Sequence, residues 1–352
     1  MSQLTVTAYY TRQGLKFSAV FLVAFFIFKT SLSLAISYWK KLHPPPPPPP
    51  DTAFGVLPAI KFPAQNRPKP KEFILQTISG TLPTDLPQTE KVYYIPQAGG
   101  RFLSLDNAIS LAKKLGFTDQ PEKISEELYQ FNNSLTRTKL KINVLTQNFH
   151  YWYDYLNDQT LINPSSLPGQ DQALQLARAF LGQINKLPDD LRDGSAQFSY
   201  WKIQTNRLVS AIAPAEADFI RVDLFRKKIA DQYPILPPNP RESLVSLLIA
   251  GVRVQNRNVV EVKFTYFPID QEKSGTYPLK TIDQAWQELQ TGKYFLASPA
   301  RISPNTTVKI KKIYLAYFDP PNPARFLQPI FVFQGDHDFY GYVPALSVEW
   351  IK

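Results

Sequence analysis

The strongest candidate for chemistry in this chain is a run of three polar residues near the C-terminus, Asp336-His337-Asp338. Two carboxylates that flank an imidazole are ligand types that can hold a cation. Three adjacent residues cannot close a coordination shell by themselves, and Gly335 directly before them is typical of a hairpin turn. We therefore interpret this run as a turn and keep a metal site at its three side chains as the alternative.

No known catalytic motif accompanies that run. The sequence contains no G-x-S-x-G, H-E-x-x-H, P-loop or G-x-G-x-x-G pattern, and its lack of cysteine excludes disulfides and thiolate metal ligands. His43 abuts a proline run, and His150 is expected in a strand with a satisfied hydrogen bond. The acid pairs at 126–127 and 189–190 do not indicate a glycosidase, because the fold sets that carboxylate separation. The sequence predicts no enzyme and no cofactor.

An aromatic run in the middle of the chain is the candidate binding surface. It comprises Tyr151, Trp152, Tyr153 and Tyr155, and these rings could form a stacking platform for a glycan or a partner peptide. In a strand, alternate side chains face opposite sides of the sheet, so at least half of the rings are expected in the core. Packing on both faces of the sheet is the simpler alternative.

Three segments that share one short pattern predict the helices of the domain. They are 106–112, 171–177 and 283–289, each with an aspartate in the first turn, where the helix dipole favours it. Thr281 and Gln284 form a capping-box pattern at the start of the third. The positions expected to be buried are Leu105, Ala108, Ile109, Ala112 and Leu115; then Ala173, Ala177, Phe180, Leu181 and Ile184; then Ile282, Ala285, Trp286 and Leu289.

Strand-like runs rich in aromatic and β-branched residues follow each helix. Examples are 138–156, 197–212, 259–267 and 307–318, whereas 244–250 reads equally as a short helix or a buried strand. Small helices packed on antiparallel sheets, repeated along the chain, predict an α+β fold.

Turn-rich stretches at 163–169 and 233–240 divide the chain into three predicted repeat units. These units are 72–162, 168–235 and 241–352.

The N-terminal region predicts a membrane anchor. A cytoplasmic stub, 1–16, precedes a mostly apolar segment, 17–39, which as a helix spans about 35 Å and exceeds the bilayer core. Tyr38 and Trp39 sit where an interfacial aromatic belt is expected, and Lys29 is a costly charge near the middle of the span. A Pro-rich linker, 40–71, follows, in which seven consecutive prolines favour an extended stalk.

Two alternatives to this topology remain open at the level of sequence. The uninterrupted apolar core 17–28 also fits a cleaved signal peptide, with Ala35-Ile36-Ser37 as the cleavage site. The basic residues on either side of the span balance, so the positive-inside rule does not fix the orientation. Whether the segment is a retained anchor or a cleaved signal peptide, the part of the chain that follows it is expected to be exported. We therefore expect a single-pass protein of the cell membrane with an extracytoplasmic C-terminal domain.

The net charge of +10 comes in part from the anchor. Residues 1–43 hold five Lys or Arg and no acid, which leaves 34 basic against 29 acidic side chains beyond them. A surplus of five, without any RNP, zinc-finger or helix-turn-helix pattern, does not indicate nucleic-acid binding.

The helix-then-sheet pattern resembles PepSY-like repeats, and the whole plan resembles YycH/YycI-type proteins, which carry such repeats outside the cell behind one membrane helix. The likeness is best over 240–352, where the residues that carry it are 275–279, 292–297, 313–318, 327–336 and 342–345. It implies a regulatory protein that contacts a sensor kinase or another envelope protein. The proline stalk is not part of that family pattern.

The sequence thus favours a membrane-anchored extracytoplasmic binding or regulatory protein that acts by protein–protein contacts. The alternatives are a cell-envelope hydrolase or wall-polymer binder with an unmarked site, and a structural subunit of an envelope assembly.

Overall fold

The computed structural model describes residues 3–42, 50–97, 104–161, 167–254, 257–297 and 302–352. The chain forms two compact units, Met1–Pro48 and Pro49–Lys352. His43 and most of the predicted proline stalk lie outside the described residues.

The first unit is a single helix, α1 (Gln3–Leu42). Within it, Phe21–Trp39 is long and apolar enough to cross a membrane, by length and composition. The described side chains of this stretch are exposed. The hydroxyl of Thr30 donates to the carbonyl of Phe26 and that of Ser33 to the carbonyl of Thr30, both at 2.9 Å, so these polar groups are satisfied inside the helix.

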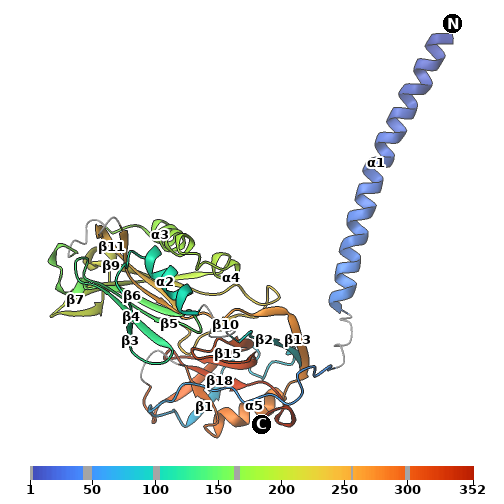
Figure 1. Ribbon diagram of the computed structural model, residues 1–352. Coiled ribbons are helices and arrows are strands. Elements are labelled where there is room, and N and C mark those ends of the chain that lie inside the picture. The colour runs from blue at the N-terminus through green and yellow to red at the C-terminus, as the bar shows by residue number, and fades with distance from the viewer. Residues whose placement is uncertain (1–2, 43–49, 98–103, 162–166, 255–256, 298–301) are drawn as a thin grey trace. The chain divides into compact units, whose positions relative to one another are not determined.

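The second unit is built on a nine-stranded sheet whose neighbouring strands are all antiparallel (Figure 1). In order across the sheet, its strands are β3 (Glu122–Lys123), β4 (Leu128–Asn133), β5 (Thr138–Asn143), β6 (Phe149–Tyr153), β12 (Arg257–Phe264), β11 (Val245–Val254), β9 (Phe219–Leu224), β7 (Ala196–Gln204) and β8 (Arg207–Ser210). The segment 244–250, left open by the sequence, is therefore a buried strand.

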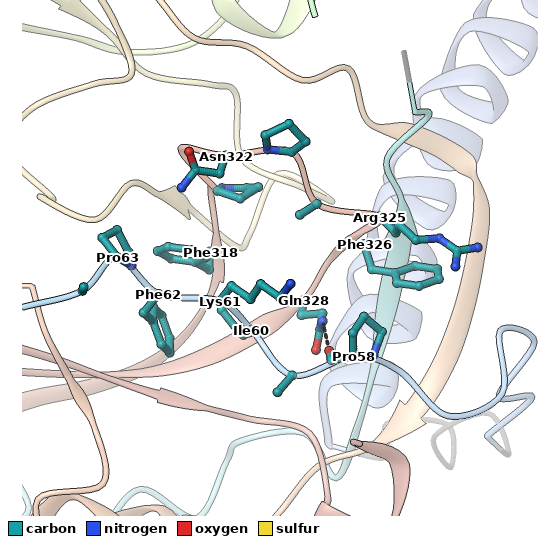
Figure 2. A pocket seen from close by; sticks show the side chains of 15 residues that line it. Pro58, Ile60, Lys61, Phe62, Pro63, Phe318, Asn322, Arg325, Phe326 and Gln328 are labelled. Atoms are coloured by element: carbon teal, nitrogen blue, oxygen red, sulfur yellow. Dashed lines mark hydrogen bonds between the residues drawn. The ribbon is translucent and has the colours of Figure 1, made fainter. Parts of the chain in front are cut away.

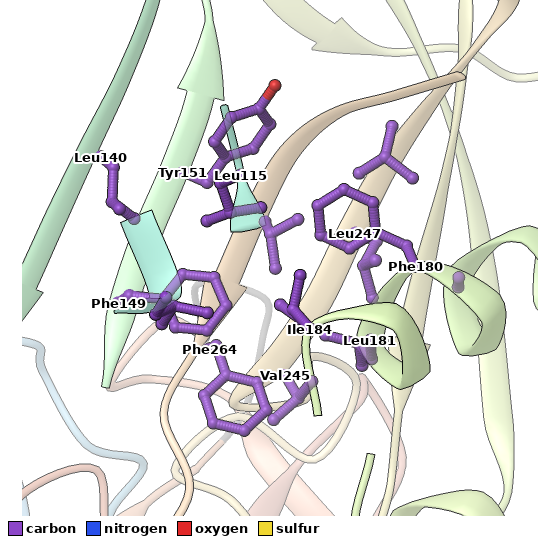
Figure 3. Close-up of a cluster of buried hydrophobic side chains, with 14 of the residues drawn as sticks. Leu115, Leu140, Phe149, Tyr151, Phe180, Leu181, Ile184, Val245, Leu247 and Phe264 are labelled. Carbon is purple, nitrogen blue, oxygen red and sulfur yellow. The ribbon is translucent and has the colours of Figure 1, made fainter. Parts of the chain in front are cut away.

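Two helices cover one face of this sheet, α2 (Ser104–Lys114) and α3 (Gln170–Gln183), with the short α4 (Asp189–Arg192) after them. Every position predicted to be buried in the second helix is buried, and Phe180 and Leu181 pack with Tyr151, Leu247 and Phe264 of the sheet (Figure 3). In the first helix Leu105 and Ile109 are only partly buried, whereas Leu111 is in the core.

A six-stranded sheet forms the second half of the domain. It comprises β1 (Glu72–Leu75), β15 (Thr307–Phe318), β17 (Pro329–Gly335), β18 (Tyr340–Pro344), β14 (Phe295–Leu296) and β10 (Ile235–Leu236), the last paired with β15. A three-stranded sheet joins it, made of β13 (Asp270–Pro278), β2 (Thr89–Tyr94) and β16 (Phe326–Leu327). The described residues also form the helical turns η1 (Tyr155–Asn157), η2 (Gln159–Leu161), η4 (Pro214–Glu216) and η5 (Val348–Trp350).

Helix α5 (Ile282–Gln290) packs on the six-stranded sheet through Ala285 and Leu289. The predicted capping box is present: the Thr281 hydroxyl accepts from the amide of Gln284, whose side chain in turn accepts from the amide of Thr281. Helices on largely antiparallel sheets confirm the predicted α+β class.

The predicted end of the linker at residue 71 needs correction. The segment 51–70 docks on the six-stranded half of the domain: Leu57 is fully buried and pairs with Ile351, and the ring of Phe62 stacks on that of Phe295 at 4.8 Å. We call this segment the strap. Its prolines are typical of a linker, but its apolar side chains pack against residues far along the chain, such as Phe295, Phe318 and Ile351.

The boundaries of the three predicted repeat units also need correction. Strands β11 and β12 of the predicted C-terminal unit pair with β9 and β6 in the nine-stranded sheet. Strands β1 and β2 of the predicted first unit pair instead with β15 and β13. Local periodicity identifies a strand and its buried face, whereas the partner is selected by backbone hydrogen bonds to distant segments.

Candidate functional site

The Asp336-His337-Asp338 run forms a tight turn between β17 and β18. His337 and Asp338 both have positive φ, 50° and 59°, and the amide of Phe339 donates to the carbonyl of Asp336 at 3.0 Å, which closes the turn. The carboxylate of Asp336 accepts from the backbone amide of Lys309 at 2.9 Å, and that of Asp338 accepts from Arg241. Within the described part of the chain, no group of three or more His, Asp or Glu side chains is placed to hold a metal ion.

The aromatic run divides between the core and the opposite face of the nine-stranded sheet. Tyr151 and Tyr153 are buried, so these two rings offer no binding surface. Trp152 lies half-buried on the face away from α2 and α3, where its ring stacks on that of His150 with centroids 4.6 Å apart. Tyr155 follows in η1.

Strand register lines up two rows of mostly polar residues across that face. The first row runs Gln130, Lys141, His150, Lys263, Ser246 and Asp223, each directly opposite the next on a neighbouring strand. The second runs Asn132, Lys139, Trp152, Glu261, Leu248 and Arg221. We call the surface formed by these two rows the charged face.

Glu261 lies at the centre of the charged face. Its carboxylate lies 2.8 Å from Nε2 of His150 and accepts from the hydroxyl of Tyr155, also at 2.8 Å. Burial alone would raise the pKa of Glu261, but the hydrogen bond to His150, the nearby charge of Lys263 and the Tyr155 hydroxyl together lower that pKa to about 2. Glu261 is therefore ionised at neutral pH, and its negative charge is taken up by these contacts within the protein.

A second buried acid lies further along the first row. Asp223 accepts from Arg221 and from the amide of Ser243, both at 2.9 Å. Burial nevertheless raises the pKa of Asp223 to about 6, because its desolvation outweighs those two contacts. Its side chain is only 4% exposed, so it contributes little negative charge to the surface.

The charges that reach solvent on this face are positive. Lys139 is exposed, the side chain of Lys263 is 58% exposed, and the ammonium of Lys141 lies 5.8 Å from the centroid of the Trp152 ring. Glu261, at 14% side-chain exposure, lies beneath them. The charged face thus presents cations around an aromatic ring, over acids that are already paired.

A polar groove of about 670 Å³ adjoins the charged face. Trp152 and Lys139 line it together with the amide side chains of Gln130, Asn132 and Asn157. Tyr155, whose hydroxyl donates to Glu261, also packs on Phe219 with ring centroids 5.4 Å apart.

Sequence reasoning identified Trp152, Tyr155 and the hydrogen bond expected for His150, but missed Glu261, Lys263 and Arg221. A signal for the first two was available, because Glu261 and Lys263 alternate with the apolar residues Val260, Val262 and Phe264. Which strand lies beside them was not readable, since β6 and β12 are more than 100 residues apart.

The predicted membrane residues Lys29, Tyr38 and Trp39 lie on α1, within the stretch long enough to cross a bilayer, and their side chains are exposed. The ammonium of Lys29 therefore has to reach an interface or a membrane partner when α1 is inserted.

This chain has low similarity to known proteins. No protein-family model and no curated protein matches the chain. An uncharacterized protein from Eubacterium rectale is similar in structure, with 11% identity and a TM-score of 0.40 over 73% of this chain and 82% of that one. The Bacillus megaterium YpeB C-terminal domain is similar with 12% identity and a TM-score of 0.31, over 72% of this chain and 95% of that domain. At these TM-scores neither likeness carries an argument about function, and the link to YycH and YycI stays a prediction.

Proposed function

We propose that this chain is a single-pass membrane-anchored binding protein whose second unit lies outside the cytoplasm and recognises an acidic surface of another membrane or envelope protein. The observation that carries the proposal is the charged face, on which exposed lysines surround Trp152 while both acids, the partly buried Glu261 and the buried Asp223, are paired within the protein.

The positive charge at the surface of the charged face supports an acidic partner. Charges on opposing surfaces accelerate encounter and select against partners of the wrong sign. Trp152 adds flat apolar area of the kind that forms the centre of many protein interfaces. The paired acids hold the sheet face rigid without offering a competing negative surface.

The membrane helix restricts the search for a partner to one plane. The regulatory role on a sensor kinase or an envelope enzyme, without catalysis by this chain, follows the family resemblance of the sequence. Lys29 supports a partner inside the membrane, because an ammonium in a span is stabilised by an acidic side chain from a neighbouring helix.

Charge reversal on the charged face tests this function. Replacing Lys139, Lys141 and Lys263 together by glutamate is expected to reduce crosslinking of the partner in native membranes at least tenfold. Each contact changes from attraction to repulsion, and 1.4 kcal/mol corresponds to a factor of ten. The measurement is mass spectrometry of crosslinked complexes recovered through an affinity tag.

A matched control carries the same change in net charge on other elements, with Lys113, Lys228 and Lys311 replaced by glutamate; all three are exposed. The control should retain its partner. Equal recovery from both triple variants, or no specific partner with the unmodified protein, contradicts the proposal.

The polar groove favours a second candidate, the binding of a wall polymer. Amide side chains beside an aromatic ring suit the hydroxyl groups and apolar faces of sugars. Retention of the protein on isolated wall polymer that Trp152→Ala abolishes, together with unchanged protein crosslinks, would favour this function over the first.

A further inference from the structure

A separate cavity of about 380 Å³ lies between the strap and the loop that links β15 to β16 (Figure 2). One wall is residues 58–64 of the strap, and the other is formed by residues 318–328. The first wall is held in place by Leu57, whose amide donates to the carbonyl of Trp350 at 2.8 Å and whose carbonyl accepts from the amide of Lys352 at 3.0 Å. The cavity is thus built into the folded domain.

The cavity is lined mainly by flat apolar groups. The rings of Phe62 and Phe318 meet edge to face at 4.8 Å, and Phe326 and four prolines complete the lining. Its volume and its apolar, aromatic lining are those of a site for a small ligand.

One buried polar group in this lining lacks a partner. Gln328 is 5% exposed, and its side-chain nitrogen donates to the carbonyl of Pro58 at 2.8 Å. That bond fixes the orientation of the amide, because only the nitrogen can donate to a carbonyl. The side-chain oxygen is buried and accepts no hydrogen bond from the described residues. A buried acceptor left in this state is costly, but this oxygen has almost no accessible surface in the cavity, so a ligand there does not reach it.

The charged residues of the lining are both basic. Lys61 and Arg325 line the cavity, and none of the described lining residues is acidic. The guanidinium of Arg325 lies 5.7 Å from the centroid of the Phe326 ring, beside the apolar part of the cavity. An anionic group on a ligand is therefore favoured near Lys61 and Arg325.

We infer that this cavity binds a small carboxylate that carries a flat aromatic body. The rings of Phe62, Phe318 and Phe326 contact the body, and Lys61 or Arg325 pairs with the carboxylate. The site is distinct from the charged face and does not rest on the proposed function.

Three compounds of similar size separate these contributions by calorimetric titration of the full chain in nanodiscs, with empty nanodiscs as the blank. Indole-3-acetate and 1-naphthaleneacetate both carry a flat aromatic body and a carboxylate, whereas indole-3-acetamide lacks the charge. We expect indole-3-acetate and 1-naphthaleneacetate to bind with similar affinity, about tenfold more tightly than indole-3-acetamide, since the amide loses one ion pair of about 1.4 kcal/mol.

Variants assign the binding to the cavity without disturbing the core. Lys61→Ala combined with Arg325→Ala should bring the affinity for indole-3-acetate to that for indole-3-acetamide, whose own affinity should not change. Lys311→Ala, on the exposed surface of β15, is the matched control. Equal affinities for the three compounds, no measurable binding of any of them, or binding that the double variant leaves intact would overturn the inference.

Discussion

Replacing Phe62 by alanine is expected to lower the free energy of unfolding by about 3 kcal/mol, near the lower end of the usual cost of removing a packed phenylalanine. The ring lies between Phe295 and Phe318, with centroids 4.8 Å away in both cases, and it holds the strap on the six-stranded sheet. Chemical denaturation of the full chain, followed by tryptophan fluorescence, measures the loss.

Ile78→Ala is the matched control for the strap. Ile78 also lies in the N-terminal part of the domain, but its side chain is fully exposed, so its removal should change stability by less than about 0.5 kcal/mol. If Phe62→Ala changed stability as little as Ile78→Ala, the segment up to residue 71 would be a linker.

Replacing Arg226 by leucine should cost about 3–5 kcal/mol, because it leaves the buried carboxylate of Asp319 and the partly buried one of Asp190 without their cation. The guanidinium, 4% exposed, lies 3.7 Å from a carboxylate oxygen of Asp190 in α4 and 3.5 Å from one of Asp319 at the end of β15. It thereby joins the helical layer of the nine-stranded sheet to the six-stranded sheet, and it also lies 4.2 Å from the centroid of the Tyr266 ring.

The loss at Arg226 is expected to depend on pH in a defined direction. Burial raises the pKa of Asp319, and the charge of Arg226 opposes that rise. Without Arg226 the folded protein holds the proton of Asp319 more tightly than the unfolded chain does. The variant therefore gains stability as the pH falls through the folded pKa, and its deficit against the unmodified protein shrinks from pH 7 to pH 4.5.

Two further variants separate the network from a general effect of arginine removal. Arg192→Leu removes an exposed ion pair of the same short helix and should cost at most about 1 kcal/mol. Adding Asp319→Leu to Arg226→Leu should recover part of the stability, because it removes one uncompensated charge. A loss of stability that is independent of pH, with no recovery in the double variant, would contradict this account of the contacts between Arg226, Asp190 and Asp319.

The elements that could be predicted from sequence are those set by local patterns. The capping box at Thr281 and the buried stripe of the second helix, from Ala173 to Ile184, depend on residues within a few positions of one another, and both are present. The hairpin turn at His337 was predicted from Gly335 and its polar neighbours for the same reason.

The strap and the sheet order could not be predicted because they depend on contacts between distant segments. Phe62 and Leu57 read as apolar residues in a proline-rich linker until Phe295 and Ile351 are placed beside them. In the same way, the alternation in β12 marks Glu261 as facing away from the core, but only the pairing of β12 with β6 places it against His150.

The most direct test of a membrane-anchored protein with an external binding face uses the absence of cysteine from the chain. Lys139→Cys and Ser2→Cys each supply a single thiol, which a membrane-impermeant maleimide can label in cells with an intact cytoplasmic membrane. We predict that the thiol at position 139 is labelled in those cells and that the thiol at position 2 is labelled only after the membrane is permeabilised. Labelling of position 139 only after permeabilisation would place the charged face in the cytoplasm and contradict the proposed function.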